Sequence, residues 1–251
     1  MPDTDRKIRV AAAGDVHCRP TRRAEAEAAI AEIADAADLL LLAGDLTTHG
    51  EPEQAEVLAG ACRGVSMPVL SVLGNHDLHS GHRDEVVEIL TDVGIRVLDP
   101  GWEVCDVRGT EVGVAGVKGF IGGFPGSYLP DFGEPSLRDV YAEASAEVDA
   151  LDDGLKAIAH CEVRIALLHY SPTTETLEGE PREIWTFLGT DRLAHPIVEH
   201  HPDLVVHGHA HAGTFEGRAE DVPVYNVSVP VMQRDYWVFE LDAQTPTTPI
   251  H

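Results

Sequence analysis

The sequence predicts an α/β protein built around a mostly parallel sheet. Short apolar runs alternate with longer segments rich in alanine and glutamate, a pattern typical of strands that alternate with helices. The apolar runs at residues 8–13, 38–43 and 67–73 are separated by segments long enough for helical crossovers. At 251 residues, 43% of them hydrophobic, the chain can form one domain with a sizeable core.

The first half of the chain is expected to fold as consecutive strand–helix–strand units. A helical segment over 22–37 follows the first strand, and the fully apolar run at 38–43 indicates a buried strand. A second helix is predicted over 52–63. A third is predicted over 82–94, where Gly94 can cap the helix end.

The second half is expected to hold more strands and one long loop. The pattern predicts a hairpin over 102–117, followed by a glycine- and proline-rich loop over 118–135 that is a candidate lid. The remaining predicted elements are a helix over 137–159, a strand at 163–168, a helix over 188–201, a strand from residue 203, and strands within 222–230 and 235–241. We expect one domain over 1–244 and a frayed tail over 245–251.

The bulk composition restricts the possible partners. A formal net charge of −25 repels a phosphate backbone, so we do not expect nucleic-acid binding. The sequence has no apolar run of the roughly 20 residues that span a bilayer, and its first residues do not resemble a signal peptide. Its four cysteines are scattered, which favours reduced thiols. We therefore expect a cytoplasmic protein without membrane contact, and the oligomeric state stays open.

Residues with metal-binding side chains follow five of the predicted strands. They are Asp15 and His17, then Asp45, then Asn75, His76 and Asp77, then His169, and finally His207, His209 and His211. Each group has a plain structural explanation, because a Gly-Asp pair often caps a helix and a single histidine is often part of the core. Ligands gather at the carboxyl ends of strands in open α/β sheets, so the ordered set indicates a shared site. By themselves, the last three histidines could be three ligands of one metal ion, part of a packed core edge, or ligands of two ions.

This ordered set resembles the calcineurin-like metallophosphoesterase family. The family pattern is D-x-H, then G-D, then G-N-H-D/E, then H, then G-H-x-H, and the match extends from residue 15 to residue 211. The resemblance implies a β-sandwich flanked by helices, with a dinuclear metal site at the carboxyl ends of the strands. It also implies a phosphoesterase that hydrolyses a small phosphodiester or phosphomonoester.

The resemblance assigns a role to each residue of the pattern. One ion would be held by Asp15, His17, Asp45 and His211, and the other by Asp45, Asn75, His169 and His209. Asp45 would bridge two divalent transition-metal ions, with Mn, Fe or Zn preferred for such mixed N/O ligands. A metal-bridging hydroxide would attack the phosphorus, and His76 would assist the leaving group. His207 falls outside the pattern and is assigned to the strand end.

One departure from a branch of the family narrows the class of phosphoesterase that we expect. The protein Ser/Thr phosphatase branch has G-D-x-x-D-R-G in its second motif, whereas this sequence has GDLTTHG, with Thr48 and His49 at the two distinctive places. We therefore expect a small-molecule phosphoesterase of the small uncapped bacterial or archaeal type. The alternatives are a non-catalytic scaffold with this fold and a nuclease.

Overall fold

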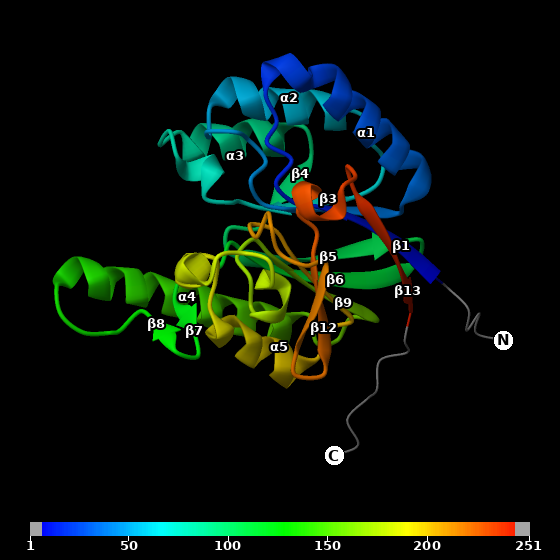
Figure 1. The fold of residues 1–251 in the computed structure, drawn as a ribbon. Helices are drawn as coiled ribbons and strands as arrows, with labels where there is room; N and C mark the ends of the chain where they lie inside the picture. Colours follow the sequence, from blue (N-terminus) through cyan, green and yellow to red (C-terminus); the bar gives the residue numbers. More distant parts are fainter. Residues whose placement is uncertain (1–6, 244–251) are drawn as a thin grey trace.

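The computed structural model describes residues 7–243, so the predicted tail at 245–251 lies outside the described residues. Two sheets pack face to face, and helices cover the outer face of each (Figure 1). The predicted α/β fold, a β-sandwich flanked by helices, is confirmed. Within the described residues, none of the helices is long and apolar enough to cross a bilayer.

The first sheet has the strand order β13–β1–β2–β3–β4. Its strands are β1 (Lys7–Ala13), β2 (Leu39–Ala43), β3 (Val69–Val72), β4 (Ile95–Val97) and β13 (Trp237–Asp242). β1 to β4 are parallel, and β13 pairs antiparallel with β1. Helical crossovers join the parallel strands, as the sequence predicts.

The second sheet has the order β11–β12–β10–β9–β6–β5. Its strands are β5 (Gly101–Val107), β6 (Thr110–Val117), β9 (Val163–Leu168), β10 (Leu204–His207), β11 (Glu216–Ala219) and β12 (Val222–Asn226). β6, β9, β10 and β12 are parallel, while β5 and β11 are antiparallel edge strands.

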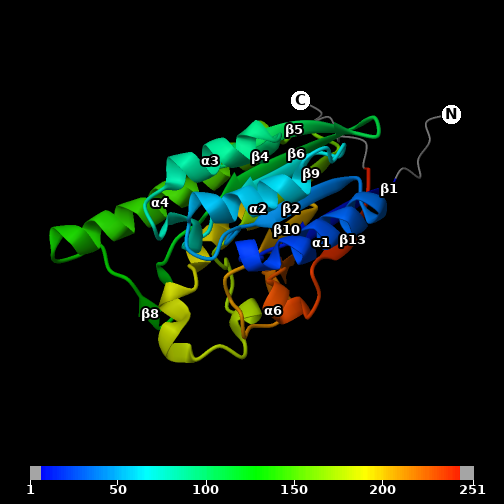
Figure 2. The same ribbon diagram turned by 90° about the horizontal axis from the view of Figure 1, so that it is seen from above.

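Helices lie on both outer faces (Figure 1), and Figure 2 looks down on the face that covers the first sheet. The first sheet is covered by α1 (Arg23–Ala36), α2 (Pro52–Cys62) and α3 (Arg83–Asp92), and the second by α4 (Pro135–Ala157) and α5 (Ala194–His200). The short α6 (Val229–Met232) precedes β13. The shorter turns are η1 (Pro20–Arg22), η2 (His76–Leu78), η3 (Glu175–Leu177), η4 (Arg182–Phe187) and η5 (Asp191–Leu193).

The alternation of side chains along the strands builds the layers. In β1, Val10 and Ala12 pack into the core between the two sheets, while Ala11 and Ala13 pack against the helices. Both faces of the central strands are therefore buried, which explains their almost continuous apolar sequences.

Two predicted segments differ from the structure. The helix predicted over 188–201 is confined to α5 and the preceding η5, because Gly189 pairs with Ser171 in an isolated bridge and the Thr190 side chain accepts from the backbone of Arg192. The loop predicted over 118–135 contains a small hairpin of β7 (Gly123–Phe124) and β8 (Ser127–Tyr128). Local pairing outweighs the helical pattern in the first segment and the loop-like composition in the second.

Candidate metal centre

The side chains of the predicted site converge where the carboxyl ends of strands from both sheets meet. The loops after β1, β2 and β3 come from the first sheet, and those after β9 and β10 come from the second. One ligand atom each from Asp15, His17, Asp45 and His211 lies within 4.8 Å of the others, and Asp45, His169 and His209 form a second such group. Asp45 belongs to both groups. Two adjoining cation sites that share one carboxylate are therefore geometrically possible.

The backbone is unusual at four of these residues. Asp15, His17, Asp45 and His209 have φ angles of 58°, 44°, 50° and 70°. Non-glycine residues seldom adopt this left-handed conformation, and it costs about 1–3 kcal/mol unless the surroundings enforce it. Such strain clusters at functional sites. Here it coincides with four of the predicted ligands.

Two motif glycines allow the loops to approach each other closely. A Cβ atom at Gly74 would collide with the carboxylate of Asp45, and one at Gly208 would collide with the carboxylate of Asp15. Any larger residue at either position would push the neighbouring loop away. Packing across the site therefore requires glycine at both positions.

Backbone carbonyls fix the proton positions on three of the histidines. Nδ1 of His17 lies 3.2 Å from the Thr47 carbonyl, and Nδ1 of His169 lies 2.9 Å from the Ala43 carbonyl. Nε2 of His209 lies 3.1 Å from the carbonyl of Phe187. A carbonyl can only accept, so each of these nitrogens donates, and the other nitrogen of a neutral ring keeps its lone pair for a metal.

The environment of His169 indicates that a cation fits this site. With Nδ1 donating to Ala43, Nε2 of His169 points at oxygen atoms of two other side chains. It lies 3.0 Å from Oδ1 of Asn75 and 3.4 Å from Oδ1 of Asp45. A lone pair that faces acceptor oxygens is unfavourable unless a positive charge lies between them. Oδ1 of Asn75 therefore lies next to the second group and offers an oxygen donor to the same cation.

The protonation states of Asp15 and His209 suit metal binding. Burial alone would raise the pKa of Asp15, but the hydrogen bond from His211 and the proximity of His169 bring it well below its usual range. Burial, with His169 nearby, lowers the pKa of His209 to about 3, so its ring is neutral at pH 7. Ionised carboxylates and neutral imidazoles are the forms that bind metals.

His76 lies beside the two groups rather than within them. Its backbone N–H donates to Oδ1 of Asp45 over 2.9 Å, and its Nδ1 donates to the Thr48 carbonyl over 2.7 Å. Within the described residues, Nε2 accepts no hydrogen bond from the protein, and it lies 3.9 Å from Oδ2 of Asp45. The side chain of His76 is 41% exposed. This nitrogen can therefore reach a molecule that approaches the site from solvent.

Asp77 connects two of the site loops. The fully buried carboxylate accepts from the backbone N–H groups of Leu46, Thr47 and Gly74 and from the hydroxyl of Thr47. Burial raises its pKa, opposed by these hydrogen bonds. Asp77 thus ties the loop that carries Asp45 to the loop after β3.

His207 lies outside both groups, where the sequence analysis assigned it. The side chain is fully buried, and its Nε2 lies 2.9 Å from the hydroxyl of Thr176. Sequence reasoning missed Tyr170, whose ring centroid lies 4.3 Å from that of His209. Its position directly after His169 is the only sequence signal that could have identified it.

Among the described residues, one further group of metal-type side chains lies away from the strand ends. Asp152, Glu199 and His200 lie close together on α4 and α5. His200 lies 2.7 Å from Asp152, which also pairs with Lys156. These are partly exposed ion pairs between two helices, and they have no connection to the predicted site.

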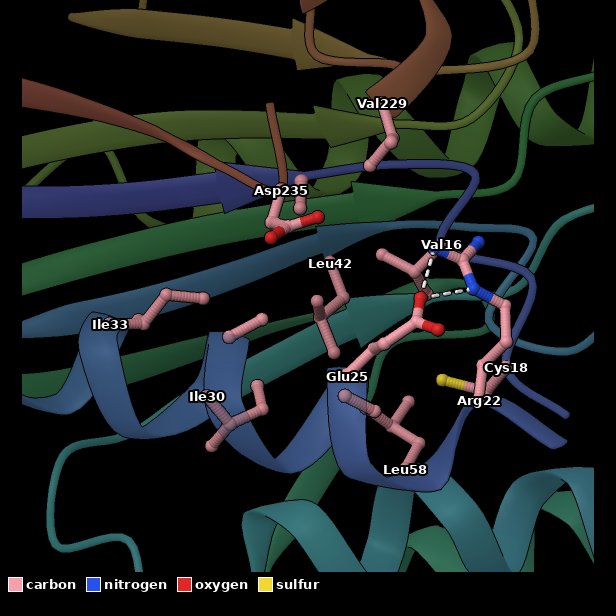
Figure 3. Close-up of a pocket in the computed structure, with 13 residues that line it drawn as sticks. Val16, Cys18, Arg22, Glu25, Ile30, Ile33, Leu42, Leu58, Val229 and Asp235 are labelled. Carbon is pink, nitrogen blue, oxygen red and sulfur yellow. Dashed lines mark hydrogen bonds and ion pairs between the residues drawn. The ribbon is translucent and has the colours of Figure 1, made fainter. Parts of the chain in front are cut away.

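An apolar cavity of about 80 Å³ lies on the helix side of the first sheet (Figure 3). Val16, Cys18 and Ile30 are among its lining residues, and the Arg22–Glu25 ion pair lies at its edge. Burial and the nearby carboxylate of Asp77 raise the pKa of Cys18 to about 12, so its thiol is neutral. None of the predicted metal ligands lines this cavity, and its apolar surface does not suit a phosphate.

Comparisons with known proteins agree with this arrangement. The profile of the family described as calcineurin-like phosphoesterase matches residues 8–213. No curated protein matches the chain in sequence. Among solved structures, phosphopantetheinyl hydrolase from Mycobacterium tuberculosis is similar, with 17% identity, a TM-score of 0.68, and coverage of 96% of this chain and 98% of that one.

Two other solved structures share the fold. A protein of Thermus thermophilus is 19% identical, with a TM-score of 0.56 and coverage of 93% of this chain and 99% of that one. GAP50, described as the anchor in the inner membrane complex of Plasmodium, is 13% identical, with a TM-score of 0.52 and coverage of 89% and 72%. At these identities the likeness concerns the fold alone.

Proposed function

The chain belongs to the calcineurin-like phosphoesterase family, and we propose that it is a dinuclear metal-dependent enzyme that hydrolyses a small phosphodiester or phosphomonoester. The observation that carries the proposal is the position of Asp45. Its carboxylate belongs to both ligand groups, and two cations roughly 3.5–4 Å apart need an anionic bridge between them. The fold alone would not suffice, because a protein described as an anchor also has it.

The donor set favours transition metals. Each group combines carboxylate oxygen with imidazole nitrogen, a mixture that suits Mn, Fe or Zn better than Ca or Mg. Asp15, His17, Asp45 and His211 would hold one ion, and Asp45, Asn75, His169 and His209 the other. When bound, the two ions would supply a nucleophile derived from water and positive charge to stabilise the phosphoryl oxygens.

The residues of the chain itself position the reacting groups. His76 is held by the Thr48 carbonyl at Nδ1 and by Asp45 at its backbone N–H, so Nε2 is the atom from which a proton can pass to the leaving oxygen. Asp77 keeps the loop that carries Asp45 in register with the one that carries His76. His76 is thus the proton donor, and Asp77 is a positioning residue.

The acidic surface supports a small substrate. A formal net charge of −25 disfavours a polyanionic ligand, which argues against a nuclease. The phosphopantetheinyl hydrolase with the same fold suggests that phosphopantetheine esters belong in any substrate panel, along with nucleotides, cyclic nucleotides and sugar phosphates.

The test combines metal analysis with hydrolysis. We expect the purified protein to bind close to two ions per chain and to release p-nitrophenol from bis-p-nitrophenyl phosphate or p-nitrophenyl phosphate when Mn²⁺ is added. A protein that binds two ions but is inert toward every ester of the panel would contradict the proposed activity. A protein that binds no ion would favour the scaffold alternative.

A further inference from the structure

We propose that an apolar rim beside the second ligand group binds an aromatic group of the substrate, so that the enzyme prefers aryl over small alkyl phosphate esters. We define the rim as the side chains of Tyr128, Ile184 and Phe187. This inference rests on the proposed function, since it concerns the substrate of the same site. It identifies a specificity-determining surface, in which Phe187 is the central residue.

The described residues include six exposed large hydrophobic side chains, and their distribution is uneven. Tyr128, Phe132, Ile184 and Phe187 all lie in the β7–β8 region or in η4, while Trp102 and Val104 lie on the edge strand β5. Phe187 is 55% exposed and Tyr128 is 52% exposed. Scattered exposed apolar residues are ordinary, but a group of them next to a polar site indicates binding.

The segment that carries Phe187 is attached to the metal-ligand loop at both of its ends. The Phe187 carbonyl accepts from Nε2 of His209 over 3.1 Å. At the other end, the carboxylate of Glu180 accepts from the backbone N–H of Ala212 over 2.7 Å. Leu188, the residue after Phe187, shares a small buried cluster with Ala210, and Trp185 packs against this cluster. The backbone at Phe187 is therefore held beside His209.

The β7–β8 hairpin extends the same surface, and Figure 2 shows β8 beside the segment that contains η4. The hydroxyls of Ser127 and Thr186 lie 2.7 Å apart, and Thr186 also donates to the Ser127 carbonyl over 2.9 Å. The hydroxyl of Tyr128 donates to Asp191 over 2.6 Å. Thr186 thus attaches the hairpin to η4, and the phenol hydroxyl of Tyr128 is held at Asp191, the first residue of η5. The rim is thus a built surface that belongs to two connected segments.

The chemistry of the rim selects the occupant. Two aromatic rings and an isoleucine side chain offer stacking and apolar contact, but no donor for a second phosphate. Because Phe187 adjoins His209, an ester whose phosphate is bound at the ligand groups can place an uncharged aromatic group against Phe187. Stacking on one ring changes affinity by roughly three- to tenfold.

The experiment keeps the leaving group constant. Methyl p-nitrophenyl phosphate and phenyl p-nitrophenyl phosphate both release p-nitrophenol, so the ratio of their kcat/KM values reports contact with the other ester group. Dissociation constants of methylphosphonate and phenylphosphonate provide a readout without turnover. The wild-type protein is compared with Phe187→Ala and with Trp102→Ala, a control at an aromatic residue of similar exposure (51%) on β5.

We expect the wild-type protein to prefer the phenyl ester, and Phe187→Ala to reduce that preference roughly three- to tenfold, mainly through KM. Trp102→Ala should keep the wild-type ratio of the two kcat/KM values. An unchanged phenyl-to-methyl ratio, or an equal loss on both esters, would overturn the inference while the proposed function stands. A metal-loaded wild-type protein that hydrolyses neither ester would overturn the proposed function, and this inference with it.

Discussion

The backbone N–H of His76 donates to Oδ1 of Asp45 over 2.9 Å, and the imidazole Nε2 of His76 lies 3.9 Å from Oδ2 of the same carboxylate. The residue proposed to donate a proton is therefore positioned by the residue proposed to bridge the two ions. The distance between the leaving-group oxygen and its proton donor would then be set by the same loop contacts that set the metal geometry. Substitutions at His76 and at Asp45 should therefore be distinguishable by their effects on metal content.

Replacement of His76 should remove catalysis and leave the metal in place. We expect His76→Ala to lower kcat by on the order of 10²–10⁴, with unchanged metal content. The loss should be larger for an alkyl phosphate than for p-nitrophenyl phosphate, since p-nitrophenolate leaves readily without protonation. His79→Ala, at an exposed residue of the same loop, should behave like wild type. An equal loss with both leaving groups would contradict the proton-donor role.

Replacement of Asp45 should remove the metal itself. Its carboxylate is shared by both ligand groups, so Asp45→Asn takes away the only charged ligand of the second group. We expect elemental analysis to find substantially fewer than two ions per chain and activity to fall at least a hundredfold. Asp152→Asn, in the ion-pair cluster between α4 and α5, serves as the control and should retain both ions. Full metal content in Asp45→Asn would refute the bridging role.

The three closely spaced histidines should differ in a mutational series. His209 and His211 belong to different ligand groups, so alanine at either position should lower metal content and reduce activity more than a hundredfold. His207 contacts Thr176 instead, and His207→Ala should keep the ions and lose tenfold or less. Metal analysis and kcat/KM on one substrate suffice for the series. Equal losses at all three positions would indicate a single three-histidine site.

Sequence periodicity predicted most of the layers because the central strands are buried on both faces and the segments between them are long enough for helical crossovers. The convergence of the site was predicted because ligands gather at the carboxyl ends of parallel strands. The structure brings Asp15, Asp45 and His209 together at these strand ends. Contacts made by the backbone were out of reach. The Phe187 carbonyl on His209 leaves no pattern in side-chain types, since it depends on a loop path set by tertiary packing.

The ion pair between Arg9 and Asp38 should make stability depend on pH. Burial would raise the pKa of Asp38, but hydrogen bonds from Arg9 lower it below its usual value. A carboxyl whose pKa is lower in the folded state stabilises the protein above its unfolded pKa of about 4, and this contribution is lost as the pH falls through the folded value. We expect Asp38→Asn to lower the free energy of unfolding by about 1–2 kcal/mol at pH 7, and by less near pH 3.

Urea unfolding at the two pH values measures this difference. Asp139→Asn, at an exposed residue of α4, is the control and should show no pH-dependent difference from wild type. A deficit of Asp38→Asn that is the same at both pH values would show that the charge of Asp38 does not contribute to stability.

Removal of Asp77 should weaken both the fold and the metal site. Its buried carboxylate accepts four hydrogen bonds, and alanine would leave the N–H groups of Leu46 and Gly74 without a partner. We expect Asp77→Ala to lose about 3–5 kcal/mol of stability, measured by thermal unfolding of the metal-free protein.

Asp203→Asn provides a comparison, because Asp203 accepts from the Arg164 backbone at the opposite ends of β9 and β10. Asp203→Asn should lower stability without changing metal affinity. Asp77→Ala should lower both stability and metal affinity, because the loops that carry Asp45 and Asn75 lose the carboxylate that joins them. Wild-type metal affinity in folded Asp77→Ala would show that the site does not depend on that anchor.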